Sequence, residues 1–436
     1  MHNQINGSLL QDRDIIRYSN NVEPESSGFR AKITPKSMRN LTFYLFLAIL
    51  FTACASDDRA NDRLTALEDQ LQEWKGDYAP DRRTDRLEVS VERGQDSLLL
   101  SGYTTVAAAW RRLDSLAAAD PEIYNEVRLL GQRDSFGLVR VSVANIRTEP
   151  GHSQELTSQA LMGTPLELLD RDHGWYLVRT PDRYLAWLEE GAIQPADQGT
   201  LADWFSDDLR TCVPAQSNVL TAPGASTIVS ELVAGDLLQV TGQTRSGHQE
   251  VRLPDGRTGW VAAGDLAPYD ALATPEAVQT EEVLTTAFAQ VGRPYLWGGT
   301  SPKAMDCSGF TKTAYYLNGY VIPRDASQQV HAGTDVPLDD DFSALERGDL
   351  LFFGNYREDG SERVTHVGFY LGEGRFLHAG ADNGYITENS LREGDADYAA
   401  HRRNSLLRAR RLEEGTPGVV PVAEAFQELY TRSSSR

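Results

Sequence analysis

The chain has 436 residues, of which 40% are apolar and 24% are charged, a composition that is ordinary for globular protein. This length is enough for two to four domains. The net charge of −21 argues against nucleic acid or an anionic membrane surface as the partner, because both repel an acidic protein. Three cysteines are too few for a disulfide scaffold.

The N-terminal region contains two dissimilar segments. Residues 1–37 are polar and lack periodicity, so we expect them to be disordered or not translated. Residues 38–53 combine a basic flank with an apolar run that is shorter than the ~18–20 residues needed to span a bilayer. This segment resembles a bacterial lipoprotein signal peptide. The resemblance implies lipidation of Cys54, translation from Met38, and a lipid-anchored protein of the cell envelope, on its periplasmic or outer-membrane side.

A tether and a small α+β domain are predicted next. Leucines at positions 64, 67 and 71 lie on one face of a short helix within a tether over 54–76. No residue in the following domain, 77–135, indicates chemistry. Its predicted elements are strands at 87–91 and 98–100, a helix at 105–118 and an apolar stretch at 123–130.

The next part of the chain repeats itself at an offset of 73 positions. The matched pairs are Asn145 and Asn218, Thr148 and Thr221, Pro150 and Pro223, Gly151 and Gly224, Val178 and Val251, Pro181 and Pro254, Asp182 and Asp255, and Trp187 and Trp260. Short alternating runs with Gly, Pro and Asp turns predict two small β-barrels, over 136–205 and 206–270. They resemble bacterial SH3-like domains.

Two positions differ between the copies in a way that packing does not explain. Glu155 aligns with Ile228, and Tyr184 aligns with Arg257. Copies under the same packing demand do not need a carboxylate and a phenol in one copy only, which suggests a function for both. The alternatives are a solvated surface carboxylate and a phenol that packs in the barrel.

A single cysteine, Cys307, stands between a Gly-rich turn and a helical pattern. The apolar positions of that helix are Phe310, Thr313, Ala314 and Leu317, with Gly319 as a stop and Pro323 beyond it. A thiol in the first turn of a helix faces unpaired N–H groups and the positive end of the dipole, which favours the nucleophilic thiolate. The alternative is a small buried apolar residue, as most free cysteines are.

Two histidines follow in strand-like runs. His366 begins one run and His378 lies near the end of the other, with a turn at 372–374 between them. Antiparallel pairing would set the two rings side by side. A cysteine protease needs an imidazole for the thiol and a third polar group to orient that imidazole. Cys307 with both histidines is therefore a candidate catalytic constellation.

These motifs resemble the NlpC-type, papain-like cell-wall peptidases. The matching residues are Tyr295, Trp297-Gly298-Gly299, Asp306-Cys307-Ser308-Gly309-Phe310, His366-Val367-Gly368 and His378, with Pro323-Arg324, Ser327, Gln328 and Gly348-Asp349-Leu350 as further landmarks. The resemblance covers residues 280–411 and implies an α+β, papain-like catalytic domain over 271–412. It implies Cys307 as nucleophile, His366 as general base, His378 as the orienting residue and Tyr295 beside the thiol. We expect no cofactor, and no compact ligand cluster indicates a metal.

The combination with two SH3-like domains resembles the γ-D-glutamyl-L-diamino acid endopeptidases. In that family a Glu and a Tyr of the first barrel hold the free amine of an N-terminal L-Ala, and Glu155 and Tyr184 lie at those motif positions. Asp306 and Ser308 would complete the amine pocket. The resemblance implies a cysteine peptidase that cleaves between γ-D-glutamate and the diamino acid of peptidoglycan stem peptides, in wall turnover or recycling. We expect a monomer whose partners are peptidoglycan-derived peptides.

Two other functions stay open at this point. The protein is alternatively an endopeptidase on intact, glycan-linked wall with the barrels as anchors, or a non-catalytic wall-binding lipoprotein.

The remaining predictions concern connecting segments. Cys212 lies in the linker between the barrels and is expected to be free. Thr274 and Pro275 are expected to open the first helix of the catalytic domain as N-cap and first residue. The buried stripe of that helix is predicted to be Leu284, Ala287, Phe288 and Val291. A linker and tail over 413–436 contains a helix near 422–430.

Overall fold

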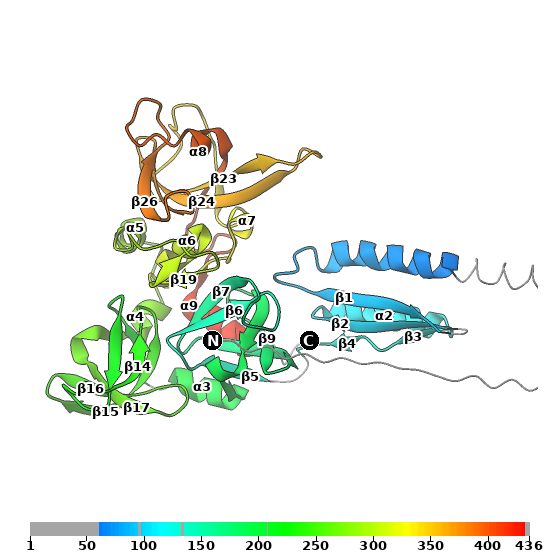
Figure 1. Cartoon of the computed structure of the whole chain (residues 1–436), viewed down its shortest axis with the longest axis horizontal. Coiled ribbons are helices and arrows are strands. Elements are labelled where there is room, and N and C mark those ends of the chain that lie inside the picture. Colours follow the sequence, from blue (N-terminus) through cyan, green and yellow to red (C-terminus); the bar gives the residue numbers. More distant parts are fainter. Residues whose placement is uncertain (1–60, 95–96, 132–134, 207, 432–436) are drawn as a thin grey trace, which may run out of the picture. The chain divides into compact units, whose positions relative to one another are not determined.

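The computed structural model describes residues 61–94, 97–131, 135–206 and 208–431 (Figure 1). All contacts below belong to one compact unit, Leu64–Arg436. The predictions for residues 1–53 and for lipidation of Cys54 lie outside the described residues. Within the described ranges, no helix is long and apolar enough to cross a membrane.

The N-terminal domain is a helix over 64–78 packed on a small sheet with one further helix. Its elements are β1 (Leu87–Arg93), β2 (Leu98–Thr104), α2 (Ala107–Ala119), β3 (Ile123–Asn125) and β4 (Arg128–Leu129). The predicted strands and helix are confirmed, with ends shifted by a few residues. Leu67 and Leu71, expected in a tether, instead pack into this core with Leu100 and Leu113.

Two seven-stranded sheets follow, and they have the same order of strands. The first β domain contains β5 (Phe136–Val139), β6 (Val143–Arg147), β7 (Leu156–Leu161), β8 (Pro165–Asp172), β9 (Trp175–Arg179), β10 (Leu185–Glu189) and β11 (Ile193–Ala196). The second β domain contains β12 (Leu209–Cys212), β13 (Ser217–Leu220), β14 (Ile228–Leu232), β15 (Leu237–Arg245), β16 (His248–Arg252), β17 (Thr258–Ala262) and β18 (Leu266–Pro268). The order β11-β5-β8-β9-β10-β6-β7 in the first corresponds to β18-β12-β15-β16-β17-β13-β14 in the second. Cys212, expected in a linker, is the last residue of β12, where it is buried as a free thiol.

Three helices and a short strand pair join these domains to the catalytic domain. The helices are α3 (Gln198–Ser206), α4 (Tyr269–Ala273) and α9 (Val422–Thr431), and the strands are β21 (Tyr320–Val321) and β28 (Val420–Pro421). Phe426 of α9 packs in one cluster with Phe136 of the first β domain, Trp204 of α3 and Val321 of the catalytic domain. The helix predicted near 422–430 is therefore part of the junction core.

The catalytic domain is a six-stranded sheet with helix α6 (Cys307–Tyr316) against one face. The order β22-β27-β23-β24-β25-β26 uses β22 (Thr334–Val336), β23 (Leu350–Tyr356), β24 (Glu362–Gly372), β25 (Arg375–Gly380), β26 (Tyr385–Ser390) and β27 (Leu406–Arg411). Its other elements are α5 (Thr280–Phe288), β19 (Thr300–Ser301), β20 (Ala304–Met305), α7 (Ala326–Gln329) and α8 (Ala400–Ser405). Phe310 of α6 meets Phe369 of β24 edge to face, with ring centroids 5.5 Å apart. This contact seats the predicted nucleophile helix on the strand that carries His366.

The predicted start of the first catalytic-domain helix was wrong. Thr274 ends α4, where its Oγ1 donates to the carbonyl of Asp270 at 3.0 Å, and α5 begins only at Thr280. A threonine hydroxyl bonds equally well to a preceding carbonyl or to a following N–H, so the local signal did not fix its direction. Because α5 ends at Phe288, this residue and Val291 are 37% and 49% exposed, whereas Leu284 and Ala287 are buried as expected.

Candidate active site

Asp306 fixes the start of the helix that begins with Cys307. As N-cap, its Oδ1 accepts the N–H of Gly309 at 2.7 Å, and its Oδ2 accepts the N–H of Gly298 at 2.9 Å. The buried guanidinium of Arg324 donates to both oxygens, at 3.1 and 2.6 Å. A Cβ on Gly309 would lie 2.0 Å from the carbonyl oxygen of Gly299, so only glycine fits there. The hydrogen bonds of the Asp-Cys-Ser-Gly motif thus fix the position of Cys307, the predicted nucleophile, at the start of α6.

The Cys307 thiol is buried, and its resting charge differs from the expectation. Burial, and then the charge of Asp306, raise the pKa of Cys307 to about 12, although the N–H groups of Val367 and Ser308 lower it in part. Burial therefore outweighs the helix N-terminus, and the thiolate expected for the resting site was wrong. The hydrogen bond from Val367 places the sulfur beside the main chain that follows His366. A neutral thiol requires a base to become a nucleophile.

The two histidines lie side by side on neighbouring antiparallel strands, as predicted. Nε2 of His366 is 2.8 Å from Nδ1 of His378, and the ring planes are 88° apart. Burial lowers the pKa of His366 well below its usual value and that of His378 to about 4, so both rings are neutral near pH 7. A Cβ on Gly368 would lie 2.9 Å from Cβ of His378, which explains the glycine of the His-Val-Gly motif.

Tyr295 lies at the thiol, where the motif predicted it. Burial, followed by the charges of Cys307 and Asp306, raises the pKa of Tyr295, so the phenol stays protonated. Its N–H donates to the carbonyl of Gly384 at 2.8 Å, which ties the nucleophile loop to the β25–β26 turn.

Two asparagines beside the histidines were missed by sequence reasoning. Oδ1 of Asn389, on β26, is 2.9 Å from Nε2 of His378, and Asn383 donates to the same oxygen at 2.9 Å. Neither residue belongs to a motif. The pairing register of β25 and β26 could have identified Asn389. In that register His378 faces Thr387, so Asn389 lies diagonally opposite the ring. However, the sequence did not predict β26.

Strand β7 of the first β domain docks on the loop that precedes the nucleophile. Oε1 of the exposed Glu155 accepts the indole N–H of Trp297 at 2.6 Å. A Cβ on Gly298 would lie 2.3 Å from the carbonyl oxygen of Leu156, so the two backbones are in direct contact. Thr300 and Gln159 exchange three further hydrogen bonds, of 2.9 to 3.1 Å. Glu155 is thereby held at the Trp-Gly-Gly loop.

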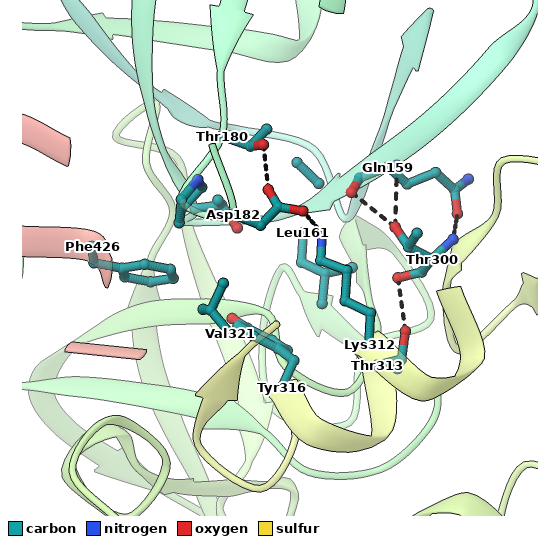
Figure 2. A pocket seen from close by; sticks show the side chains of 13 residues that line it. Gln159, Leu161, Thr180, Asp182, Thr300, Lys312, Thr313, Tyr316, Val321 and Phe426 are labelled. Atoms are coloured by element: carbon teal, nitrogen blue, oxygen red, sulfur yellow. Dashed lines mark hydrogen bonds and ion pairs between the residues drawn. The ribbon is translucent and has the colours of Figure 1, made fainter. Parts of the chain in front are cut away.

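The contact between β7 and the loop that contains Trp297 and Thr300 forms a seam between the first β domain and the catalytic domain. A mainly apolar cavity with one buried ion pair lies next to this seam (Figure 2). Nζ of Lys312, on α6, is 2.6 Å from Oδ2 of Asp182, whose side chain is 2% exposed. Although burial alone would raise the pKa of Asp182, the ammonium of Lys312 holds it below its usual value. Figure 2 shows Phe426 and Val321 along the apolar wall. The first β domain is thus clamped to the nucleophile helix itself.

Tyr184 lies at the same seam, with its hydroxyl 2.6 Å from Oγ1 of Thr157 and 3.2 Å from Oδ2 of Asp325. Tyr184 thus contacts Thr157, which is two residues along the chain from Glu155. The neighbour of Asp325, Arg324, donates to Oγ of Ser308 at 3.0 Å. The structure therefore gathers Glu155, Tyr184 and Ser308 around one seam.

Asp306 is also at this seam, but its carboxylate has a different task. It accepts from Gly298, Gly309, Ser308 and Arg324, which occupies both oxygens with the cap of α6. A direct bond from Asp306 to a substrate amine would compete with these donors.

The N-terminal domain, for which no chemistry was predicted, reaches the same place. Nη1 of Arg83 donates to Asp325 at 2.7 Å and to Ser327 at 2.9 Å. Gln328 donates to Asp81 at 2.8 Å. Asp325 is therefore held by side chains of two other domains, Arg83 and Tyr184.

A buried thiol at a helix start, in contact with the N–H of Val367, and two hydrogen-bonded histidines on the adjoining sheet are the groups that a papain-like cysteine peptidase requires. Residues 292–403 match the model of the NlpC/P60 family, and residues 146–193 match that of the bacterial dipeptidyl-peptidase SH3 domain. The chain belongs to the NlpC/P60 family of cysteine peptidases, as its motifs predicted, and the α+β fold class with an SH3-like domain is confirmed.

Two relatives and one solved structure support this membership. The chain is 31% identical over 265 residues to dipeptidyl-peptidase 6 of Lysinibacillus sphaericus, covering 59% of this chain and 92% of the relative. It is 30% identical over 289 residues to γ-D-glutamyl-L-lysine dipeptidyl-peptidase of Bacillus cereus, covering 63% and 81%. The crystal structure of an NlpC/P60 family protein from Bacillus cereus has the same fold, with a TM-score of 0.53 at 23% identity, over 63% of this chain and 99% of that chain.

Proposed function

We propose that this peptidase hydrolyses the bond between γ-D-glutamate and the diamino acid in peptidoglycan stem peptides whose N-terminal L-alanine has a free amine. The observation that carries the proposal is the position of Glu155, a carboxylate of the first β domain that contacts Trp297 in the loop before the nucleophile. A bound ammonium needs a counter-charge and acceptors once water is excluded. Glu155 supplies the charge, and Tyr184 supplies a neighbouring oxygen. The name of the Bacillus cereus relative points to the same bond.

In the proposed reaction, Cys307 is the nucleophile and His366 the general base. His366 takes the thiol proton as the sulfur attacks the γ-carbonyl carbon, and main-chain N–H groups at the start of α6 stabilise the oxyanion. The C–N bond then breaks, and the leaving amine takes the proton from His366. Water, deprotonated by His366, hydrolyses the thioester and releases L-Ala-γ-D-Glu and the free thiol. His378 orients His366, and Tyr295 and Ser308 border the acyl group.

A requirement for a free amine restricts the enzyme to peptides already released from the glycan. The proposed role is therefore turnover or recycling of wall fragments rather than cleavage of intact wall.

The test compares L-Ala-γ-D-Glu-L-Lys, its diaminopimelate analogue and their N-acetyl derivatives, with products identified by mass spectrometry. We expect release of L-Ala-γ-D-Glu from the free-amine peptides only, and no release by the Cys307→Ala variant. Equal cleavage of the N-acetyl peptides would reject the amine requirement and favour an endopeptidase on intact wall. Activity that survives Cys307→Ala would reject the mechanism.

We also propose that lipidation of Cys54 attaches the enzyme, as a monomer, to the cell envelope. Metabolic labelling with a fatty acid should label the wild type and not Cys54→Ala, which should be recovered in the soluble fraction. Equal labelling of both proteins would exclude this anchor.

A further inference from the structure

The hydrogen bond between His366 and His378 is compatible with two arrangements of protons. In the first, Nε2–H of His366 donates to Nδ1 of His378, which leaves Nδ1 of His366 unprotonated. In the second, Nδ1–H of His378 donates to Nε2 of His366, whose own proton then sits on Nδ1. Only the first arrangement lets His366 accept the thiol proton, because Nδ1 is the nitrogen that does not face His378.

The orientation of the Asn389 side chain decides between them. Nδ2 of Asn389 is 3.3 Å from the main-chain carbonyl oxygen of Asp397, which can only accept, so the amide nitrogen must face that way. Its oxygen therefore faces Nε2 of His378, at 2.9 Å. Asn383 donates one of its own N–H groups to this same oxygen, which agrees with the orientation that the carbonyl of Asp397 sets.

An amide oxygen accepts hydrogen bonds and donates none, so Nε2 of His378 must carry the proton. Nδ1 of His378 then accepts from His366, and Nδ1 of His366 is left free. The second arrangement would set two lone pairs 2.9 Å apart at a ring that is 0% exposed, where no bulk water relieves them. The amide nitrogen of Asn383 has a second N–H and lies 3.4 Å from Nε2 of His378, but this long contact would not offset the two facing lone pairs at 2.9 Å.

We propose that Asn389 is a positioning residue that sets the tautomer of the histidine pair and so keeps Nδ1 of His366 available for the thiol. The proposal rests on the proposed role of His366 as general base. Asn389, on β26, thus joins Cys307, His366 and His378 as a fourth residue of the site. The carbonyl of Asp397 fixes the orientation of its side chain.

The kinetic test compares Asn389→Leu with Asn389→Asp. Both variants lose the N–H that bonds Asp397, but only aspartate keeps an acceptor for His378, to which it also adds a negative charge, so recovery by aspartate would show that the acceptor and not the N–H is required. We expect kcat of Asn389→Leu to fall on the order of 10- to 100-fold with KM nearly unchanged, and Asn389→Asp to recover most of that loss. The matched control, Asn355→Leu, removes an exposed asparagine from β23 and should behave as the wild type.

The decisive readout is the proton position, measured by long-range ¹H–¹⁵N correlation on the full chain with labelled histidine. The wild type should show His366 and His378 both protonated at Nε2, and Asn389→Leu should show a mixture or a shift to Nδ1. A wild-type His378 protonated at Nδ1, or an Asn389→Leu variant with unchanged kcat and tautomers, would overturn the proposal. If Asn389→Leu fails to fold, the wild-type spectrum and the Asn389→Asp kinetics still decide. A protein with Nε2 protonation that ignores the tripeptide would refute the proposed substrate and leave the tautomer assignment standing.

Discussion

The two β domains have the same strand order but contact the catalytic domain at different places. The first contributes Glu155, Gln159 and Asp182 to contacts with the nucleophile loop and helix. The second contacts the catalytic domain through the exposed ion pair of Glu231 with Lys303. It also contacts the last residue of α6, Tyr316, whose hydroxyl donates to the carbonyl of Gly235. A shared topology thus says little about function, which depends on a few side chains along one strand and one turn.

The two mismatched repeat positions show this difference most directly. At the position of Glu155 the second β domain has Ile228, which is 54% exposed. At the position of Tyr184 it has Arg257, which pairs with Asp255 of its own turn at 2.8 Å. Each residue of the first β domain can therefore be tested against a natural counterpart on the same scaffold.

The largest difference is expected for the aspartates at matched positions. Asp182→Ala should lower the free energy of unfolding by about 3–5 kcal/mol, because it leaves the largely buried ammonium of Lys312 without its partner. Asp255→Ala should cost only about 0–1 kcal/mol, because Arg257 is 43% exposed. Denaturant unfolding followed by tryptophan fluorescence measures both. The double variant Asp182→Ala/Lys312→Met should recover most of the loss, and equal losses for the two aspartates would contradict the clamp.

The next largest effect concerns substrate binding. Glu155→Ala should raise KM for the free-amine tripeptide about 10- to 100-fold with little change in kcat, because a charge-assisted hydrogen bond to the ammonium is lost. Ile228→Ala should leave both constants unchanged. Steady-state kinetics on both variants measures the difference, and an unchanged KM for Glu155→Ala would remove this residue from the amine site.

A smaller effect is expected at the second mismatched position. Tyr184→Phe removes a hydroxyl that bonds Thr157 and Asp325, so KM should rise about 5-fold, in line with the loss of one neutral hydrogen bond. Arg257→Met, its counterpart, should have no effect on KM. A larger effect at Arg257 than at Tyr184 would show that the second β domain also serves the substrate.

Variants of the two β domains should show the same dependence of kcat on pH. Burial lowers the pKa of His366 well below 6.5 and that of His378 to about 4, so kcat should hold as pH falls through 6.5 and decline only in more acidic solution. The wild type, Ile228→Ala and Tyr184→Phe should all show this same decline of kcat at acidic pH. An unfolded histidine binds a proton at about pH 6.5, so stability should also fall as pH drops below that value. A midpoint for kcat near pH 6.5 would show that the histidines titrate as exposed groups.

Local sequence signals predicted the positions of the proposed catalytic residues well and their environment poorly. Cys307 at a helix start and two histidines across a hairpin follow from patterns within a few residues of each, and the structure places them so. The neutral state of the Cys307 thiol does not follow from such patterns, because segments far apart in the chain determine how deeply this side chain is buried. Likewise, Asn389 and Arg83 reach the site through strand register and domain docking, for which no local motif exists. The repeat comparison was the one long-range signal, and it identified Glu155 and Tyr184.

Helix α9 has a consequence for the order of events during biosynthesis. Residues 420–431 leave the ribosome after the entire catalytic domain, yet they supply β28, which pairs with β21, and Phe426, which packs against the first β domain. The apolar core of the junction is therefore incomplete until these residues emerge, whereas Gln159 and Asp182 already find their partners Thr300 and Lys312. A nascent chain that lacks them has every proposed catalytic side chain but lacks part of the apolar core that joins both β domains to the catalytic domain.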